Sequence, residues 1–448
     1  MLAGIEFLVA QLALGLLGAG AAFHPSVRSI SIVGRAAIAA CAGAVILTVE
    51  ATLFSLARVP WTIPGLSIPL MLLSALCALR WRKQPGPSRN SIAVRPEIAI
   101  WSGVICGASL LYLVVSLFSS SATSTDYLLF WGVKAVRFAD VRGISADFLR
   151  DPFTIHASLD YPPLVPVVQA WGCLAAGRMP WRVVPTLSAL WVVAAVVLLY
   201  DRARSRLGDP GAAALVTFWT AAMSVSLVHS LSGGNAEAPV VCFEAIALAW
   251  LLTEQDEGES RFVPTLALCG AALTKVEGMG AVVLIAAGCY FRDRGLPPLR
   301  RAARNLALIA WPAAAVGVWF AYQWSESLRV GYQPHGQFLS LHPEQLSTIV
   351  ISLVQSLDAG SLWLPWAFAL GVLISRAPAW RAAAPALVLT AGLLLFLVFD
   401  YLHDKDDPTE RIGWTAPRVT QPALSAIILG AGVLSLHGRR PSQPGRVS

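Results

Sequence analysis

Long apolar segments recur almost from the first residue to the last, and they constrain the fold of this chain more than any other feature. Leu2–Phe23, Ile32–Ala57 and Ile63–Leu79 are each long enough to cross a bilayer as a helix, and similar segments continue to Leu436. Of the 448 residues, 56% are hydrophobic and only 13% are charged, which is well below the share in soluble proteins. The pattern predicts an all-α polytopic bundle of about 11–13 spans that forms one integral membrane domain over residues 1–448.

Basic residues predict which polar segments lie inside. The segment LRWRKQPGPSRNSIAVR has five basic residues and no acidic residue, which is typical of a cytoplasmic loop. If successive spans cross the membrane in alternating directions from this loop, the amino terminus lies outside. Residues 201–206, 292–304 and the tail 438–448 then lie inside. The polar segments 119–162, 325–345 and 401–421 then lie outside.

Residues 164–177 are short for a span and leave two arrangements open. A re-entrant segment with a single later crossing fits the charges and is favoured. Two short crossings fit the hydropathy but would place residues 201–206 outside.

The remaining composition argues against several other classes of function. The net charge of +7 comes from short basic loops, and no basic face with interleaved aromatic residues suggests a nucleic-acid partner. The seven cysteines lie in apolar segments without a CxxC pair, so we expect them to pack as small hydrophobic residues. We therefore expect neither a metal site nor a cofactor.

Asp126 is the first candidate for chemistry. It follows an apolar segment, Ile98–Phe118, and precedes a predicted amphipathic helix, Tyr127–Phe138. One interpretation is an N-cap or first-turn carboxylate of that helix. The other is a general base, because partial burial beside Tyr127 and Trp131 would raise the pKa of the carboxyl group.

Three further candidates lie in the same outer segment. Asp160 and Tyr161 belong to the motif SLDYPPLVP, whose prolines favour extended backbone at Tyr161 and set the start of the next helix. Asp160 is interpreted either as a helix cap or as a polar wall residue of a substrate site. Lys134 is a further substrate-binding candidate.

Four charged residues at later membrane edges could complete a site. Glu237 follows a Gly-Gly-Asn turn in SGGNAEAP and is either a helix-dipole partner or a substrate-binding carboxylate. Lys275 and Glu277 interrupt an apolar segment in ALTKVEG and are either an ion pair or a phosphate ligand with its orienting acid. Arg418 in TAPRVTQ is either an interfacial arginine or a bidentate phosphate ligand.

Four motifs resemble those of the GT-C superfamily of polytopic glycosyltransferases, especially bacterial members related to the protein O-mannosyltransferase and aminoarabinose transferase families. They are STDYLLFWGVKA, DYPPLVP, GNAEAP and ALTKVEG, in that order along Asp126–Gly280, with a looser similarity at Arg418. Glu237 stands where an aspartate is more usual in these families.

The resemblance implies inverting transfer of a sugar from a polyprenyl-phosphate donor to the hydroxyl of a lipid, glycan or protein acceptor at the extracytoplasmic face. By this similarity Asp126 would be the general base. Lys275 and Arg418 would neutralise the leaving phosphate, and Glu237 would contact substrate hydroxyls. We expect the protein in a bacterial inner (plasma) membrane, in contact with membrane lipid.

Two other functions remain open at this point. In a transporter or lipid flippase, Lys275, Glu237 and Glu277 would form a coupling site near the middle of the membrane. Such proteins usually contain paired broken helices, whereas this chain has one clear break, at TKVEG. An accessory subunit with a degenerate site is the third possibility.

Overall fold

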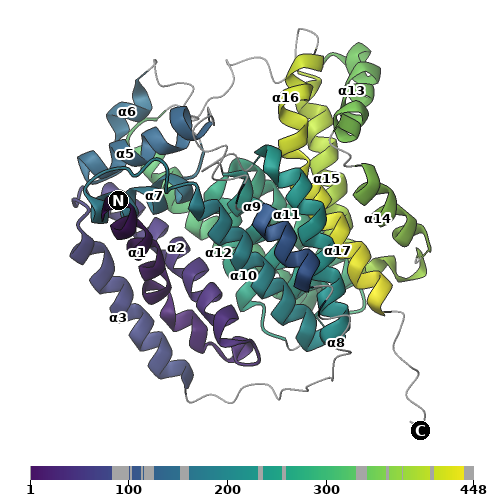
Figure 1. Ribbon diagram of the computed structural model, residues 1–448, viewed down its shortest axis with the longest axis horizontal. Helices are drawn as coiled ribbons and strands as arrows, with labels where there is room; N and C mark the ends of the chain where they lie inside the picture. Colours follow the sequence, from purple (N-terminus) through teal and green to yellow (C-terminus); the bar gives the residue numbers. More distant parts are fainter. Residues whose placement is uncertain are drawn as a thin grey trace.

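A computed structural model describes residues 2–82, 100, 103–112, 115, 126–151, 161–230, 236–254, 259–328, 341–359, 363–375, 377–403 and 408–437. Within these ranges the chain is helical and contains no strand, which confirms the predicted all-α fold for the described part (Figure 1). The predicted outer residues 119–125, 152–160, 329–340 and 404–407, and the predicted inner tail 438–448, lie outside the described residues.

The helices and helical turns follow the apolar segments of the sequence. In chain order they are α1 (Leu2–Leu17), η1 (Ala19–Phe23), η2 (Pro25–Val27), α2 (Ile32–Leu56), α3 (Ile63–Arg82), η3 (Tyr127–Trp131), α5 (Gly132–Val141), α6 (Ala146–Arg150), α7 (Leu164–Ala176), α8 (Thr186–Ser230), α9 (Glu237–Leu252), α10 (Phe262–Thr274), α11 (Val276–Arg292), α12 (Pro298–Ser325), η6 (Pro343–Gln345), α13 (Leu346–Ala359), α14 (Trp363–Ser375), η7 (Ala377–Ala383), α15 (Ala384–Tyr401), α16 (Thr409–Val419) and α17 (Gln421–His437). A further short apolar helix covers Gly103–Tyr112.

Five of the described helices are long and apolar enough to cross a membrane. They are Ile32–Leu56, Ile63–Arg82, Thr186–Ser224, Pro298–Ser325 and Trp380–Tyr401. The other apolar helices are shorter, such as α1, which ends at Leu17 and continues as the 3₁₀ turn η1. Because the other helices are too short to be identified as spans by length alone, the expected total of 11–13 spans stays a prediction.

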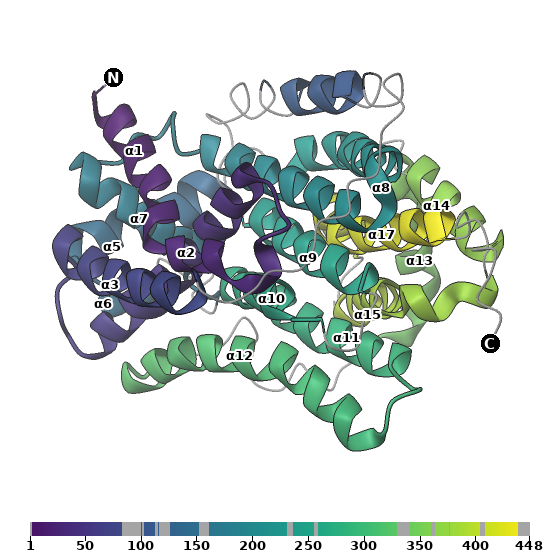
Figure 2. The same ribbon diagram turned by 90° about the horizontal axis from the view of Figure 1, so that it is seen from below.

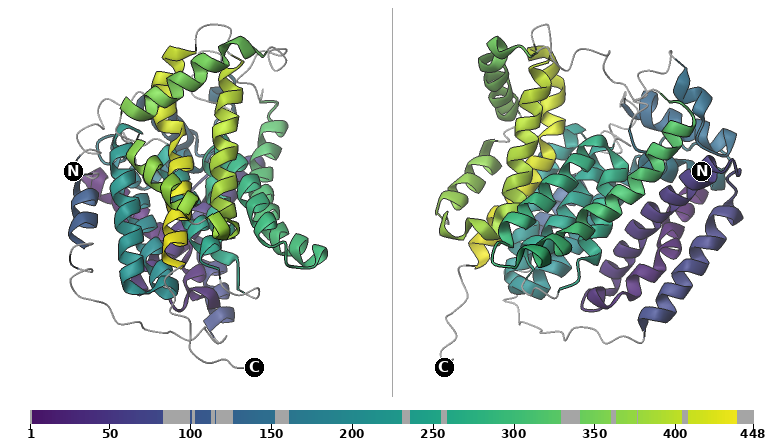
Figure 3. Two further views of the ribbon diagram at one scale, coloured as in Figure 1. Left: turned by 90° about the vertical axis from the view of Figure 1, so that its right-hand side faces the viewer. Right: turned by 180° about the vertical axis from the view of Figure 1, so that it is seen from behind.

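The helices form three groups that lie side by side. Helices α1–α3 lie on the left of Figure 1, α8–α12 in the centre, and α13–α17 on the right. Seen from below, α12 lies along one flank of the molecule, where it packs against α10 and α11 (Figure 2). Both views in Figure 3 place α13 beside α16 at one end of the molecule.

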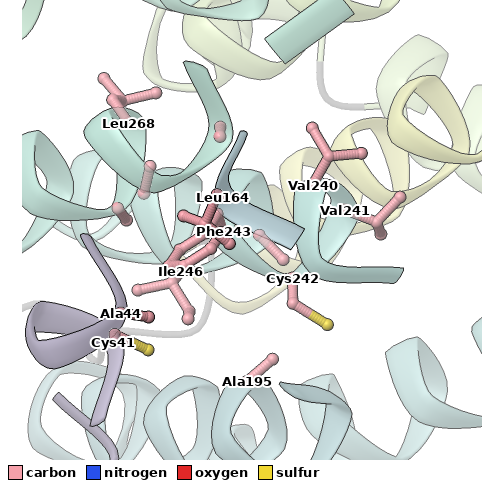
Figure 4. Packing of buried hydrophobic residues seen from close by; sticks show 14 of the residues in the cluster. Cys41, Ala44, Leu164, Ala195, Val240, Val241, Cys242, Phe243, Ile246 and Leu268 are labelled. Carbon is pink, nitrogen blue, oxygen red and sulfur yellow. The ribbon is translucent and has the colours of Figure 1, made fainter. Parts of the chain in front are cut away.

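Helix α9 is the central element of the bundle, and all of its residues are buried. A helix that is hydrophobic on every side must be surrounded by other elements, and α9 packs against α8, α10 and α17. Figure 4 shows Phe243 and Ile246 of this helix close to Leu164 of α7, in the same core as Cys41 and Ala44 of α2.

Ion pairs join several helices at the lower end of the bundle in Figure 1. Glu254 accepts from Arg261 at 2.9 Å and from Arg304 at 2.8 Å, and it also contacts Arg292. Asp293 accepts from Arg261 at 3.0 Å. We call these five side chains the arginine cluster; it connects the lower ends of α9, α10, α11 and α12.

A second group of charges lies near the bend of α8. Arg202 and Arg206 both pair with Glu259, and Asp201 accepts from the hydroxyl of Ser31 at the start of α2. Helix α8 bends at Gly208, whose φ of 78° is in the left-handed region that glycine adopts without strain. Residues 201–206 lie just before the bend of α8, and residues 292–304 lie where α11 ends and α12 begins. Both segments are predicted to be on the inner side, and they meet the same part of the bundle.

Three helices connect this lower end to the upper end. Helix α9 runs from Glu237 at the top to the arginine cluster below, α10 runs upward to Thr274, and α11 returns from Val276 to Arg292. The 16 residues of α9 span about 24 Å at 1.5 Å per residue. Most charged groups of these helices therefore gather at the two ends; the exception is Glu244, which is buried in the middle of α9.

Helix α7 starts inside the bundle and returns to the upper end. Leu164 at its start lies in the core near Phe243 (Figure 4). Trp171 donates to the carbonyl of Ala10, and Trp181, beyond the end of α7, accepts from the hydroxyl of Tyr127 at 3.0 Å. Tyr161, just before α7, stacks on Trp131 of η3, so the segments on both sides of α7 lie near η3. Whether residues 164–177 cross a membrane or re-enter it stays a prediction.

The break between α10 and α11 gives a stability prediction. A Cβ at Gly278 would lie 2.1 Å from the backbone oxygen of Ala271, so the two helices approach too closely for any side chain there. At Gly280 an added Cβ meets nothing within 4 Å. We expect Gly278→Ala to destabilise the folded protein by about 1–3 kcal/mol, and the matched control Gly280→Ala to leave it as stable or more stable. Chemical denaturation in detergent micelles measures both; equal stability of the two variants would contradict this account of the break.

Candidate functional site

A cavity of about 560 Å³ opens at the upper end of the bundle, between η3, α9, α11, α15 and α16. Its volume is in the range of small-molecule sites. The apolar part of its wall includes Val240, Val241, Val276, Leu393, Phe396 and Leu397. The polar part consists of Asp126, Tyr161, Glu237, Lys275, Glu277, Asp400, Tyr401, His403, Arg411, Thr415 and Arg418.

Asp126 immediately precedes the π-helical turn η3, which leads into α5. Its backbone is already helical and its side chain makes no capping hydrogen bond, so it does not act as an N-cap, whereas its place at the first turn agrees with the other form of that interpretation. The carboxylate instead accepts from Nη2 of Arg418. Single π-helical turns are common at functional sites because they reorient side chains, and here the hydroxyl of Tyr127 also anchors the turn by donating to the carbonyl of Trp181.

Glu237 occupies the first turn of the buried helix α9, and its side chain is only 5% exposed. It is favourably placed for the helix dipole, as one of its two interpretations requires. It also accepts from Nζ of Lys275 at 3.2 Å and from Nη2 of Arg418 at 2.7 Å, both through Oε1. Two cations thus compensate the cost of burying this carboxylate.

Lys275 lies in the break between α10 and α11. Its extended backbone, with φ of −149° and ψ of 159°, ends one helix and starts the next. Besides Glu237, its ammonium group contacts Oε1 of Glu277 at 3.2 Å, and it lies 5.4 Å from the ring centre of Tyr161. The predicted Lys275–Glu277 pair is therefore present, and it is part of a larger network.

Arg418 contacts both Asp126 and Glu237, which lie 292 and 181 residues before it in the sequence. It lies in the last turn of α16, where a cation also suits the helix dipole. Its contacts to Asp126 and Glu237 both use Nη2. Together the three carboxylates of Asp126, Glu237 and Glu277 and the two cations of Lys275 and Arg418 form one continuous network, which we call the charge network.

Aromatic side chains form the wall next to the charge network. Tyr161 stacks on Trp131 of η3, with ring centres 5.6 Å apart and an interplanar angle of 14°. Lys134 lies one turn further on, buried, with its ammonium group 5.2 Å from the ring centre of Trp131. Lys134 does not line the cavity, so the structure separates this candidate from the others.

Burial raises the pKa of Asp126 above its ordinary value of 3.8. Arg418 lowers it, Glu237 raises it and Lys275 lowers it, and the net direction is upward. The carboxyl group therefore binds a proton more readily than an exposed aspartate does, which is the property that a general base working near neutral pH needs.

The cavity contains six of the eight residues that the sequence analysis singled out: Asp126, Tyr161, Glu237, Lys275, Glu277 and Arg418. Asp160 lies outside the described residues. Asp400, His403, Arg411 and Thr415 also line the cavity, although the sequence analysis did not select them. Asp400 directly precedes residues 401–421, the predicted polar outer loop, and the other three residues lie within it. The mixture of acids, arginine and histidine in this segment was the available signal.

Within the described part of the chain, no group of three or more His, Cys, Asp or Glu side chains is arranged to hold a metal ion. In the charge network Lys275 and Arg418 lie between the carboxylates. The chemistry that these residues can perform is proton transfer at Asp126 and stabilisation of an anion by the two cations.

The buried ion pair gives a second stability prediction. Lys275→Met would leave Glu237 and Glu277 without their shared cation, and we expect it to cost about 3–5 kcal/mol of unfolding free energy. The double variant Glu237→Gln, Lys275→Met should cost less than the sum of the two single variants, because it removes both charges of the pair. Denaturation of all four proteins in micelles gives the coupling energy, and strict additivity would contradict a direct interaction.

Comparisons with protein-family models, with curated proteins and with solved structures return no match to this chain. What the cavity does is therefore inferred from its own side chains and their geometry.

Proposed function

We propose that this protein is an integral membrane glycosyltransferase that moves a sugar from a polyprenyl-phosphate donor to an acceptor hydroxyl, with inversion, at the extracytoplasmic face. One observation carries the proposal. Asp126, Glu237, Lys275 and Arg418 come from four distant parts of the sequence and meet in a single cavity at one end of the bundle.

Insertion into a membrane is supported by the surface of the long helices. Helix α3 has a mean hydropathy of 1.7 over its most apolar window, yet only 17% of that window is buried inside the protein. Leu72, Leu76 and Leu79 on this helix are each more than 60% exposed. Water would disfavour an apolar surface of this kind, and lipid would cover it. We include the shorter helices among the 11–13 proposed spans because they pack beside the long ones.

The proposed orientation follows from the charges at the two ends. The arginine cluster and the arginines of residues 201–206 lie at the end opposite to the cavity, and arginine-rich ends face the cytoplasm in most membrane proteins. The cavity would then open on the extracytoplasmic side, which in a bacterium is the outer face of the plasma membrane.

In the proposed reaction Asp126 is the general base. Its carboxylate takes the proton of the acceptor hydroxyl while the hydroxyl oxygen forms a bond to the anomeric carbon of the donor. The bond between that carbon and the phosphate oxygen breaks, and its electron pair leaves with the polyprenyl phosphate. Because attack and departure occur on opposite faces, the configuration at the anomeric carbon inverts.

Lys275 and Arg418 are proposed to stabilise the departing phosphate. An already ionised leaving group needs neighbouring cations rather than a strong acid. Both contacts of Arg418 to the carboxylates use Nη2, so a phosphate can approach its other nitrogens. Glu237 holds both cations in place, and Tyr161 lines the cavity beside Lys275.

A transporter is the second candidate, and the helix break at Lys275 is the observation that favours it. The coupling sites of transporters lie near the middle of the membrane. Here the charge network lies at the upper ends of α9 and α10, about 20 Å or more from the arginine cluster along each helix. This position favours the enzyme.

Replacement of the proposed base tests the reaction directly. Purified protein in lipid nanodiscs would be incubated with polyprenyl-phosphate hexoses and pentoses together with lipid, glycan and peptide acceptors that carry free hydroxyl groups, and release of polyprenyl phosphate would be measured. We expect Asp126→Asn to lower the rate about 10²–10⁴-fold, because loss of a general base has effects of this size. The matched control is Asp140→Asn on the exposed face of α5, which should keep the wild-type rate. Full activity of Asp126→Asn would rule out the assigned base, and no release by the wild-type protein would rule out the function.

The raised pKa of Asp126 predicts the pH dependence of the same reaction. The base must be ionised, so the rate should fall as the pH falls through a pKa above 3.8. Arg418 lowers this pKa, so Arg418→Gln should move the acidic limb of the pH–rate profile to higher pH, in addition to lowering the maximal rate. Profiles of the two proteins would show this, and a limb that moves to lower pH in the variant would contradict the proposed contact.

A further inference from the structure

A second polar group lines the same cavity and takes no part in the proposed proton transfer. It consists of Asp400 and Tyr401 at the end of α15, His403 just after it, and Arg411 and Thr415 on α16. We call these five residues the rim group.

The rim group is held in place by its own contacts. Arg411 donates to Oδ2 of Asp400 at 2.6 Å and lies 5.3 Å from the ring centre of Tyr401. The hydroxyl of Tyr401 is 2.5 Å from Oγ1 of Thr415, which in turn donates to the backbone oxygen of Arg411 at 2.8 Å.

An apolar contact fixes the two helices that carry the rim group. Tyr401 packs with Ile349 of α13 and with Ile412 and Ala416 of α16, and all four side chains are buried. The polar ends of Asp400 and Arg411 are therefore presented by a packed helix pair, so a ligand would not have to order them first.

The position of the rim group relates it to the charge network. Arg411 and Arg418 are seven residues apart on α16, so they lie on nearly the same face, about 10 Å apart along the axis. Thr415 lies between them. A molecule whose reacting hydroxyl is at Asp126 can thus extend a sugar ring toward Arg411.

The charges of the rim group indicate what kind of molecule it binds. Asp400 and Arg411 form an ion pair whose side chains are 28% and 42% exposed, and both line the cavity. An anion would be repelled by Asp400 and a cation by Arg411. Neighbouring hydroxyl groups of a sugar can each donate to the carboxylate and accept from the guanidinium.

We propose that the rim group binds an uncharged saccharide that is part of the acceptor. This inference rests on the proposed function, because it places the acceptor between the rim group and Asp126. The acceptor would then be a glycan or glycolipid with a neutral sugar, rather than a protein side chain or a phosphate.

Binding can be tested without the sugar donor. Wild-type protein in nanodiscs of sugar-free phospholipid would be titrated with uncharged methyl glycosides, with N-acetylserine methylamide and with ethyl phosphate, and followed by saturation-transfer NMR. We expect binding of at least one glycoside, weakened about tenfold or more in Arg411→Ala because hydrogen bonds to a charged group are lost. The matched control is Arg300→Ala at the exposed start of α12, which should bind as the wild type does.

Asp400→Asn is the second variant, and it provides the same binding test if Arg411→Ala does not fold. Glycoside binding that is insensitive to both variants would overturn the proposal, as would preferential binding of ethyl phosphate or the serine compound. In the release assay with a bound glycoside as acceptor, the rim variants should raise the KM of the glycoside more than they lower kcat. Binding that depends on Arg411 without any release of polyprenyl phosphate would support the saccharide site and reject the glycosyltransferase.

Discussion

A carboxylate at the start of a fully buried helix needs cations beside it, and the upper part of this protein is built around that requirement at Glu237. Helix α9 is surrounded on every side and the Glu237 side chain is only 5% exposed, so water solvates its carboxylate poorly. Lys275 reaches it only because α10 and α11 break where they do, and Gly278 permits that break by letting the two helices approach closely. Arg418 reaches it from α16 and brings Asp126 into the same network.

This arrangement also explains how one cavity can serve both halves of the proposed reaction. The cations that would receive a phosphate are held by carboxylates before any ligand arrives, and the proposed base is one of those carboxylates.

The positions of the helices could be predicted well from the sequence, because the length of each apolar segment largely determines where a helix begins and ends. Ile32–Ala57 is observed as Ile32–Leu56, and the Lys275–Glu277 interruption is observed as the break between α10 and α11. Hydropathy says nothing about which helices are neighbours, so the contact between Asp126 and Arg418, 292 residues apart, could be suspected only from their predicted common side. Asp400 and Arg411 were not predicted as site residues because charged residues in an outer segment are usually solvated. The residues next to them in the sequence also do not indicate that α13 packs against α15 and α16 beside a cavity. Lys134 shares a motif with Asp126, but α5 turns its side chain toward Trp131 and away from the cavity.

The charged residues of the network are made at different times during translation. Glu237 leaves the ribosome 38 residues before Lys275 and 181 residues before Arg418, so α9 must enter its surroundings before either cation exists. During that interval other groups, or a bound proton, have to neutralise the carboxylate. The partner of Asp126 is Arg418, which is made 292 residues later, as part of α16. The cavity is therefore completed only after α16 has been made, and a nascent chain that stops before α16 carries all three acids of the network with only one of its two cations.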